Sequence, residues 1–311
     1  MKTIVCIGEL LIDFFCTELD VNLIDGTYFE KQAGGAPANV CAAIAKLGGH
    51  AKFCGKVGND SFGHFLERTL QQAGVDTTML VKGRKPTTLA FVSRIAGGER
   101  DFIFNRGADE TLTIEDIKWR YLDAEIAHFG SATALLSNPF YETYMEVMHV
   151  LKKRGAFISF DPNYREDLWK GNELAYHERI AACVQLADFI KMSEEEFALF
   201  GHEVPKGKWF AVTKGHAGTW ISNGEQSALI PSIKIQSIDS TGAGDAFVGA
   251  MLKQFSDYPT LNTFTFKDFQ QLTRFSNIVG AITCTKVGAM TALPAMEDVL
   301  LYMNNDKGRF T

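Results

Sequence analysis

The chain has 311 residues, of which 46% are hydrophobic and 22% are charged, and its formal net charge is −6. This length allows one large α/β domain or two small ones, and the composition is that of a globular protein. The negative charge and the absence of a basic stripe argue against nucleic acid as the main partner. A phosphorylated ligand stays open, because it needs only local positive potential.

The N-terminal run and the cysteines indicate the compartment. Glu9 and Asp13 interrupt the first apolar run and no small-residue cleavage site follows, so the run predicts a buried strand and not a signal peptide. No apolar run reaches the ~18 residues that a membrane span needs. The six cysteines have no C-x-x-C spacing, and most have apolar neighbours. We therefore expect buried thiols, a cytoplasmic protein and no membrane partner.

Short apolar runs typical of strands alternate with helical patterns along the chain. A strand at 4–7 precedes a helix at 38–47, a strand at 51–56 and a helix at 63–73. Further strands are expected at 126–129, 156–160, 189–191 and 210–213, with helices between most of them. This alternation predicts an α/β fold with a doubly wound, mostly parallel sheet and helices on both faces. No repeat or interdomain linker appears, so we expect a single domain over residues 1–311.

Two inserted segments, about 10–33 and 86–107, carry strand signals without intervening helices. In the second, the runs 88–94 and 100–104 flank Ala96-Gly97-Gly98-Glu99, which predicts a hairpin turn. We expect a small accessory sheet that serves as a lid or as a dimer surface.

The stretch from Asp239 to Asp245, with Gly242-Ala243-Gly244 before its last residue, carries the strongest chemical signal. It follows an alternating, strand-like run at 233–238 and precedes an apolar, helix-compatible run at 246–252. A glycine-rich turn that opens a helix presents backbone N–H groups and the positive end of the helix dipole to an anion. An aspartate at such a place suggests that a carboxylate takes a proton while neighbouring amides stabilise a charged oxygen or a phosphate.

Two segments near the N-terminus suit a sugar. Gly34 and Gly35 let a ligand approach the backbone, and Asn39 in the following helix can donate to and accept from hydroxyl groups. Asp13 lies just past the first strand, where open α/β sheets bind ligands. An ordinary loop-to-helix junction and a solvated turn aspartate explain these residues equally well.

Polar segments also follow later strands. Asp161-Pro162-Asn163-Tyr164-Arg165 places an arginine suited to phosphate at a strand end, although a plain proline turn fits too. In 191–196, Ser193 with three glutamates is a good helix N-cap, and a functional interpretation places Glu196 near a hydrated Mg²⁺. The segment 213–218 matches T-x-G-x-x-G, which suits a nucleotide or a hairpin turn. Asn277 and the small residues at 283–289 could wall an adenine pocket, although such an asparagine is usually a surface residue.

Several common motifs are missing from the sequence. There is no Walker A motif, no G-x-G-x-x-G after the first strand and no G-x-S-x-G elbow. There is also no H-x-x-x-H or Cys/His ligand cluster among the seven histidines, which argues against a transition-metal site.

Taken together and in this order, these segments resemble the ribokinase-like (PfkB) carbohydrate kinase family. Gly34 to Gly58 is similar to the family's N-terminal signature, and Asp239–Asp245 is similar to its C-terminal signature D-T-x-G-A-G-D, with Ser240 where threonine is usual. The resemblance covers essentially the whole chain. It implies a ribokinase-like α/β fold with a small β-sheet lid, and an ATP-dependent sugar kinase that uses Mg²⁺.

The resemblance also implies a role for each candidate residue. Asp245 would be the general base, the amides of Gly242, Ala243 and Gly244 would form an anion hole, and Arg165 would neutralise phosphoryl charge. The residues that would hold the sugar are Asp13, Gly34, Gly35, Asn39 and Arg106. Those around ATP would be Lys191, Ser193, Thr213, Lys214, Gly215, Gly218, Asn277 and Gly288. Glu196 and Asp161 would act on Mg²⁺ through water, and Asp239 and Thr241 are candidate ligands of the K⁺ that many relatives bind.

The chain departs from the usual family pattern at the metal site. Many members have asparagine where this chain has Ser193, and the run 191–196 resembles the K-x-S-x-E-E variant of fructokinases.

The resemblance leaves the acceptor sugar open among several candidates. The segments 34–39, 161–165 and 288–294 look most like bacterial fructokinases, which favours phosphorylation of fructose at its 6-hydroxyl. Aminoimidazole riboside kinase, 2-keto-3-deoxygluconate kinase and ribokinase are the alternatives. A catalytically silent sugar-binding relative is disfavoured, because Asp245 and the small residues before it are intact.

Overall fold

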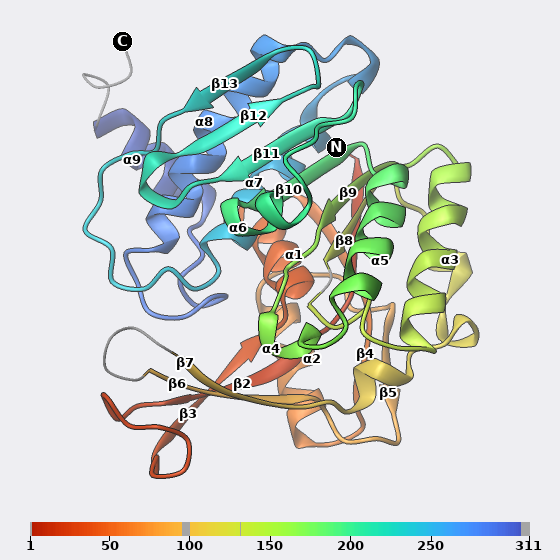
Figure 1. Ribbon diagram of the computed structural model, residues 1–311, viewed down its shortest axis with the longest axis vertical. Helices are drawn as coiled ribbons and strands as arrows, with labels where there is room; N and C mark the ends of the chain where they lie inside the picture. The colour runs from red at the N-terminus through yellow and green to blue at the C-terminus, as the bar shows by residue number, and fades with distance from the viewer. Residues whose placement is uncertain (1, 95–99, 131, 306–311) are drawn as a thin grey trace.

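The structure is a computed structural model that describes residues 2–94, 100–130 and 132–305. Within these residues, the main sheet has nine strands in the order β13-β12-β11-β10-β9-β8-β1-β4-β5 (Figure 1). The strands of this sheet are β1 (Thr3–Ile7), β4 (His50–Gly58), β5 (Leu80–Gly83), β8 (Ile126–Gly130), β9 (Phe157–Asp161), β10 (Phe189–Ser193), β11 (Trp209–Thr213), β12 (Thr219–Ser222) and β13 (Ser227–Ile230). Neighbours from β5 to β11 pair in parallel, and β12 and β13 extend the sheet antiparallel.

Helices bury both faces of this sheet, which confirms the doubly wound α/β prediction. Ile4 and Cys6 of β1 belong to one core with α1, α2, α7, α8 and α9, whereas Val5 and Ile7 belong to a second core with α3 and α5. Successive side chains of a strand point to opposite faces, so β1 contributes to both cores. The helices are α1 (Ala36–Lys46), α2 (Ser61–Gln72), α3 (Phe140–Lys153), α4 (Glu166–Trp169), α5 (Glu173–Leu186), α6 (Glu194–Leu199), α7 (Ala243–Asp257), α8 (Phe266–Thr283) and α9 (Met296–Asn305).

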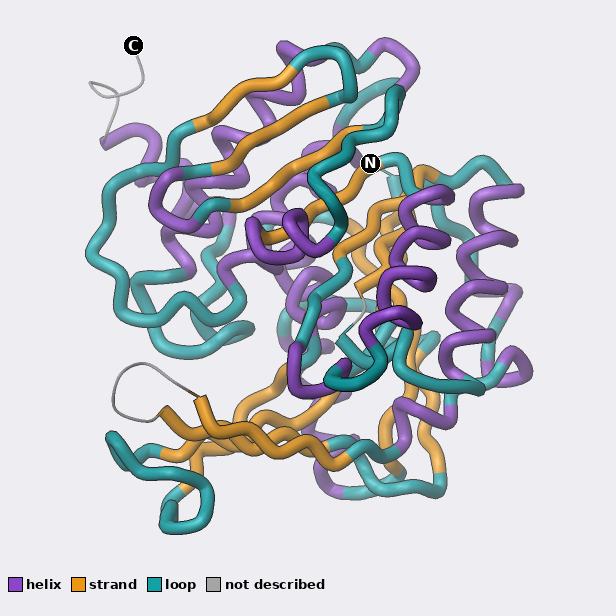
Figure 2. Tube along the Cα trace, viewed as in Figure 1, coloured by secondary structure: helices purple, strands orange, loops and turns teal. Residues whose placement is uncertain are grey.

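The two inserted segments form a separate four-stranded sheet, as expected. Its order is β3-β2-β6-β7, with β2 (Leu11–Cys16), β3 (Phe29–Gly34), β6 (Leu89–Arg94) and β7 (Arg100–Asn105). Figure 2 shows this sheet, at the bottom of the view, apart from the main sheet. The predicted turn at 96–99 lies outside the described residues.

The strand-like run before α7 does not form a strand. The alternating run at 233–238 is not assigned to a strand, and Ile238 is 61% exposed. The main sheet ends at β13, after which the chain leaves it at Pro231, and Asn277 of α8 donates to the carbonyl oxygens of Ile230 and Pro231. Alternation alone does not supply a partner strand, so this segment connects β13 to α7 as a loop.

The remaining expectations concern the membrane and the cysteines. Among the described residues, no helix is long and apolar enough to cross a membrane. All six cysteines are free thiols, four of them buried, which agrees with the expected core thiols.

Candidate active site

A cavity of about 240 Å³ lies between the small sheet and the carboxyl ends of β1, β8 and β9. The small sheet contributes every second residue of three strands, so that one face of it forms a wall of the cavity. These residues are Leu11, Asp13 and Phe15 of β2, Ala90 and Val92 of β6, and Phe102 and Phe104 of β7. On its opposite face, Phe14 stacks on Phe91 and meets Phe62 of α2 edge to face. The amphipathic strands therefore hold the sheet over the cavity.

Asp245 lines the cavity from the first turn of α7 and is only 9% exposed. Asn39 of α1 donates from Nδ2 to Asp245 Oδ2 at 2.8 Å. Burial raises the pKa of Asp245 above its usual range, while the Asn39 hydrogen bond and the positive charges of Lys191 and Arg165 oppose that rise. A raised pKa makes the carboxylate a stronger base, which suits proton abstraction from a hydroxyl group.

The turn that opens α7 has the shape of an anion site. Gly242 is the N-cap residue with φ +75°, and a Cβ there would lie 2.9 Å from Ala289 Cα. Gly244 belongs to the first helical turn, where N–H groups have no intrahelical acceptor. Ala243 differs, because its N–H donates to Ser240 O at 3.2 Å. Of the expected anion-hole donors, Ala243 is thus already engaged within the turn.

Lys191 lies beside this turn, although it was expected only near ATP. It is 7% exposed, and its Nζ forms an ion pair with Asp161 Oδ2 at 3.1 Å. A Cβ on Gly244 would lie 3.1 Å from that Nζ, so the missing side chain leaves room for the ammonium group. Despite desolvation, Asp161, Glu196 and Asp245 hold the pKa of Lys191 above its usual value. A buried cation therefore lies next to the turn that opens α7.

Asp13 and the two glycines of the predicted sugar site come together. A Cβ on Gly34 would lie 1.8 Å from Asp13 Oδ2, and Gly35 has φ +106°, where a Cβ would lie 2.4 Å from Glu9 O. Gly35 therefore requires glycine, and a side chain at Gly34 would displace the Asp13 carboxyl group. Burial raises the pKa of Asp13 to about 7; Arg165 opposes this shift and Asp245 adds to it. Arg165, which is exposed, lines the same cavity.

Glu9 also lines this cavity and was not among the expected site residues. It is fully buried, and its Oε1 accepts from the Ala36 amide at 3.2 Å. Burial raises the pKa of Glu9 to about 7. In the sequence, Glu9 stands out only as an acidic residue that interrupts the first apolar run. There it argues against a signal peptide and gives no sign of a ligand.

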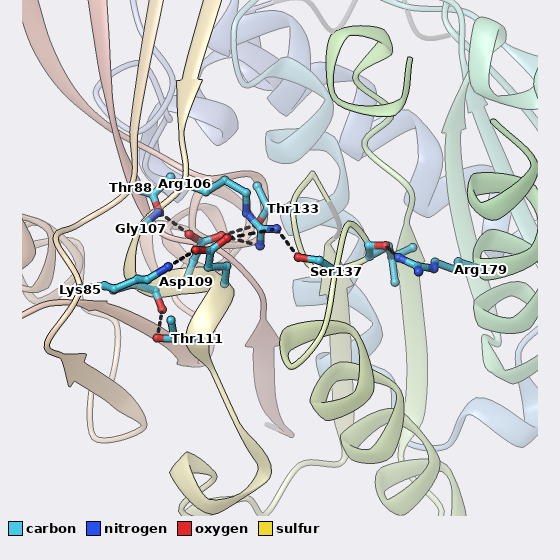
Figure 3. Close-up of polar contacts among 12 residues, drawn as sticks. Lys85, Thr88, Arg106, Gly107, Asp109, Thr111, Thr133, Ser137 and Arg179 are labelled. Atoms are coloured by element: carbon cyan, nitrogen blue, oxygen red, sulfur yellow. Dashed lines mark hydrogen bonds and ion pairs between the residues drawn. The ribbon is translucent and has the colours of Figure 1, made fainter. Parts of the chain in front are cut away.

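Arg106 lies elsewhere. Among the described residues it does not line the cavity of Asp245 but an adjoining one of about 350 Å³, which shares Phe104, Asp167 and Leu168 with the first. Its Nη1 donates to Ser137 Oγ at 2.9 Å, and its Nη2 lies 3.4 Å from Asp109 Oδ2 (Figure 3). The expected sugar contact of Arg106 stays a prediction, and the guanidinium already has protein partners.

The predicted Mg²⁺ residues are engaged with the protein. Ser193 caps α6, and Glu196 Oε2 accepts from the Ser193 amide at 2.6 Å, while Oε1 accepts from the Tyr164 amide at 2.7 Å. Burial raises the pKa of Asp161 to about 7, although Lys191 opposes that shift. Mg²⁺ usually keeps several waters and binds through one or two carboxylates and substrate phosphates. These residues fit an ion contacted through water, and they do not form a cage of direct ligands.

The predicted nucleotide residues lie at the ends of β10 and β11 and on α8. Thr213 ends β11, and Lys214 pairs with Glu194. Gly218 has φ +104°, and a Cβ there would lie 2.1 Å from Ile230 O. The side-chain amide of Asn277 accepts from Thr219 Oγ1 of β12 at 2.6 Å and donates to the end of β13. It therefore connects α8 to the last two strands of the main sheet. Gly215, which begins a short 3-10 helix, has open space around its Cα.

The predicted K⁺ residues organise the loop before α7. Asp239 Oδ1 accepts from Thr241 Oγ1 at 2.7 Å, and Asp239 Oδ2 accepts from the Gly288 amide at 3.0 Å. A Cβ on Gly288 would lie 2.6 Å from Oε1 of Gln32, which belongs to β3 of the small sheet. The loop of Gly288 thereby connects the Asp239 turn with the small sheet. A carboxylate and a hydroxyl oxygen fit a monovalent cation, and K⁺ binding here stays a prediction.

Comparisons with known proteins agree with this geometry. A fructokinase-1 from Oryza sativa subsp. japonica is 38% identical over 98% of both chains. A fructokinase from Xylella fastidiosa with bound ATP matches at 32% identity and a TM-score of 0.88, over 98% of this chain and 99% of the other. A fructokinase double mutant from Vibrio cholerae O395, bound to fructose, ADP and a potassium ion, matches at 28% identity and a TM-score of 0.85, over 97% and 98%. The model of the pfkB family carbohydrate kinases matches residues 1–296. The chain therefore belongs to the pfkB family of carbohydrate kinases.

Proposed function

We propose that the protein transfers the γ-phosphoryl group of ATP to the 6-hydroxyl of fructose and releases fructose 6-phosphate and ADP. The observation that carries this proposal is the buried Asp245, which lies at the N-terminus of α7 and within hydrogen-bond distance of Asn39 in the cavity. Relatives named fructokinase, at 37–38% identity over nearly the whole chain, support fructose as the acceptor.

The proton of the acceptor hydroxyl goes to Asp245. As the O–H bond breaks, the hydroxyl oxygen attacks the γ-phosphorus, and the bond from that phosphorus to the oxygen of ADP breaks. Asn39 holds Asp245 Oδ2 at 2.8 Å and so orients the carboxylate. Asp13 would accept hydrogen bonds from hydroxyl groups of the sugar, and the missing side chain of Gly34 leaves room for its Oδ2.

Several groups would stabilise the negative charge that develops on the transferring phosphoryl group. The first-turn amides of α7, chiefly those of Gly242 and Gly244, would donate to the phosphoryl oxygens, and Arg165 and Lys191 would supply positive charge. Mg²⁺ would neutralise the phosphates, and Asp161 and Glu196 would contact its waters. K⁺ near Asp239 and Thr241 would support the loop. ATP would lie along Ser193, Thr213, Gly215 and Gly288.

A panel of acceptors tests this proposal. With ATP and Mg²⁺, we expect the highest kcat/KM for fructose among fructose, aminoimidazole riboside, 2-keto-3-deoxygluconate and ribose. Phosphorus NMR of the product should show the ester at the 6-position. A higher kcat/KM for aminoimidazole riboside or 2-keto-3-deoxygluconate would replace fructose as the acceptor, and failure on every sugar would overturn the kinase proposal.

We further propose that the protein acts in the cytoplasm as a homodimer that pairs through the small sheet. Four large apolar side chains on or beside this sheet are exposed, namely Leu19, Ile24, Tyr28 and Ile103. Burying them against a second copy would remove them from water. Light scattering after gel filtration should give twice the mass of the chain, and a monomer at micromolar concentration would contradict this pairing.

A further inference from the structure

Glu9 combines complete burial with an oxygen that has no hydrogen-bond partner among the described residues. Glu9 follows β1 and lines the cavity that Asp13, Asn39 and Asp245 also line. Glu9 Oε1 accepts from Ala36, but Glu9 Oε2 has no partner. A buried polar atom without a partner costs free energy, so native proteins retain few of them and often at functional positions.

No side chain in the described part of the chain donates a hydrogen bond to this oxygen. The charged residues that act on Glu9 most strongly are Asp109, whose negative charge opposes ionisation, and Arg165, which favours it. Asp109 is committed to Thr133 at 2.8 Å and to Arg106, and Arg165 donates to Tyr164 O at 2.8 Å. The free oxygen is therefore left for a group that arrives in the cavity.

The bound oxygen of Glu9 links this position to the general base. Ala36, which it holds, is the first residue of α1, and Asn39 is in the same first turn, with its amide donating to Gly35 O at 2.9 Å. Asn39 in turn donates to Asp245. The Glu9 carboxylate thus holds the turn that carries Asn39, and Glu9 also belongs to the lining of the ligand cavity.

We propose that Glu9 is a substrate-binding residue whose Oε2 accepts a hydrogen bond from a hydroxyl group of the acceptor sugar, other than the hydroxyl that is phosphorylated. This inference rests on the proposed function. A sugar hydroxyl fits because it is a small neutral donor, and because two further residues that line the cavity, Asp13 and Asn39, also suit hydroxyl groups.

The substitution Glu9→Gln separates the two oxygens. Glutamine keeps one acceptor for the Ala36 amide and replaces the free oxygen by an NH₂ group, which can only donate. Fructose affinity, measured by calorimetry without ATP, should fall roughly 10- to 100-fold, the range expected for a lost hydrogen bond to a charged group. The affinity for ATP and the melting temperature should stay unchanged. Glu146→Gln, at an exposed position of α3, is the matched control and should leave all three unchanged.

Deoxy sugars distinguish a sugar contact from a structural role. Deoxyfructoses and 2,5-anhydromannitol together lack, one at a time, the hydroxyl groups that are not phosphorylated. For one of them, wild type and Glu9→Gln should bind with the same affinity, because the contact is already missing. Equal losses for fructose and for every analogue, or no loss at all, would overturn the inference. Wild type must first phosphorylate fructose, so a failure there would concern the proposed function and not Glu9.

Discussion

Asp13 shows how a single carboxyl group at the site affects stability. Its pKa is about 7 in the folded chain because of burial, whereas an unfolded aspartate titrates near pH ~3.9. The folded state therefore binds more protons between these values, and its contribution to stability falls as the pH rises from about 4 to about 7. Above pH 7 the contribution changes no further.

We expect Asp13→Asn to remove this dependence in the sugar-free protein. At pH 8 the variant should be more stable than wild type by roughly 1–2 kcal/mol, since one pKa unit corresponds to about 1.4 kcal/mol and Asp13 is only half-buried. At pH 4.5 the difference should be much smaller, because only a small part of the pH range between the two pKa values has then been crossed. Urea denaturation at both pH values measures it, and a stability difference that does not change with pH would contradict the assigned pKa.

Residue identity made part of the site predictable. The glycines before Asp245 and those before Asn39 could be recognised because close backbone approach needs glycine, and at Gly35 and Gly242 the positive φ and the nearby backbone leave no room for a Cβ. The position of Arg106 could not be predicted, because its cavity depends on how β7 meets the loop of Ser137. Glu9 was missed because nothing in a local pattern shows that a buried oxygen has no partner.

At the scale of elements, Asp109 joins the small sheet to the main one. It is 1% exposed and accepts from Thr88, next to β6, and from Thr133, beyond β8, while Arg106 after β7 pairs with it (Figure 3). The start of β6, the end of β7 and the end of β8 therefore meet at one buried carboxylate.

We expect Asp109→Ala to lower the free energy of unfolding by about 3–5 kcal/mol, because it leaves Arg106 without its buried counter-charge. Chemical denaturation measures this loss. Glu110→Gln is the control, since Glu110 pairs with the half-exposed Lys85 and lies 3.9 Å from Arg106 Nη1, at the limit of an ion pair, so it should cost about 0–1 kcal/mol. Equal losses for both variants would show that Asp109 does not join the sheets in this way.

The spacing of apolar residues predicted whether a segment is a helix or a strand wherever the tertiary packing agreed with that spacing. The alternation of strands and helices predicted the main sheet, because a parallel sheet needs a covering helix on each side. The same alternation failed at 233–238, where the edge of the sheet at β13 leaves the run unpaired. Edge position is a property of the folded sheet and cannot be read from a local pattern.

At the scale of the whole molecule, the small sheet covers the cavity with one of its faces. A sheet in this position can close on a bound sugar and exclude water from the phosphoryl transfer, which would limit hydrolysis of ATP. We expect the radius of gyration from solution scattering to decrease when a sugar and a non-hydrolysable ATP analogue bind together. An unchanged radius with both ligands bound would count against closure.

In the proposed mechanism Asp245 takes the proton of the acceptor hydroxyl, and the substitution Asp245→Asn tests this role. The replacement keeps an oxygen that can accept from Asn39, so the fold and the sugar affinity should stay near those of wild type. We predict that kcat with fructose and ATP falls by at least about 100-fold, the lower end of what general-base catalysis contributes. A variant of normal stability whose kcat stays within a few-fold of wild type would contradict the account.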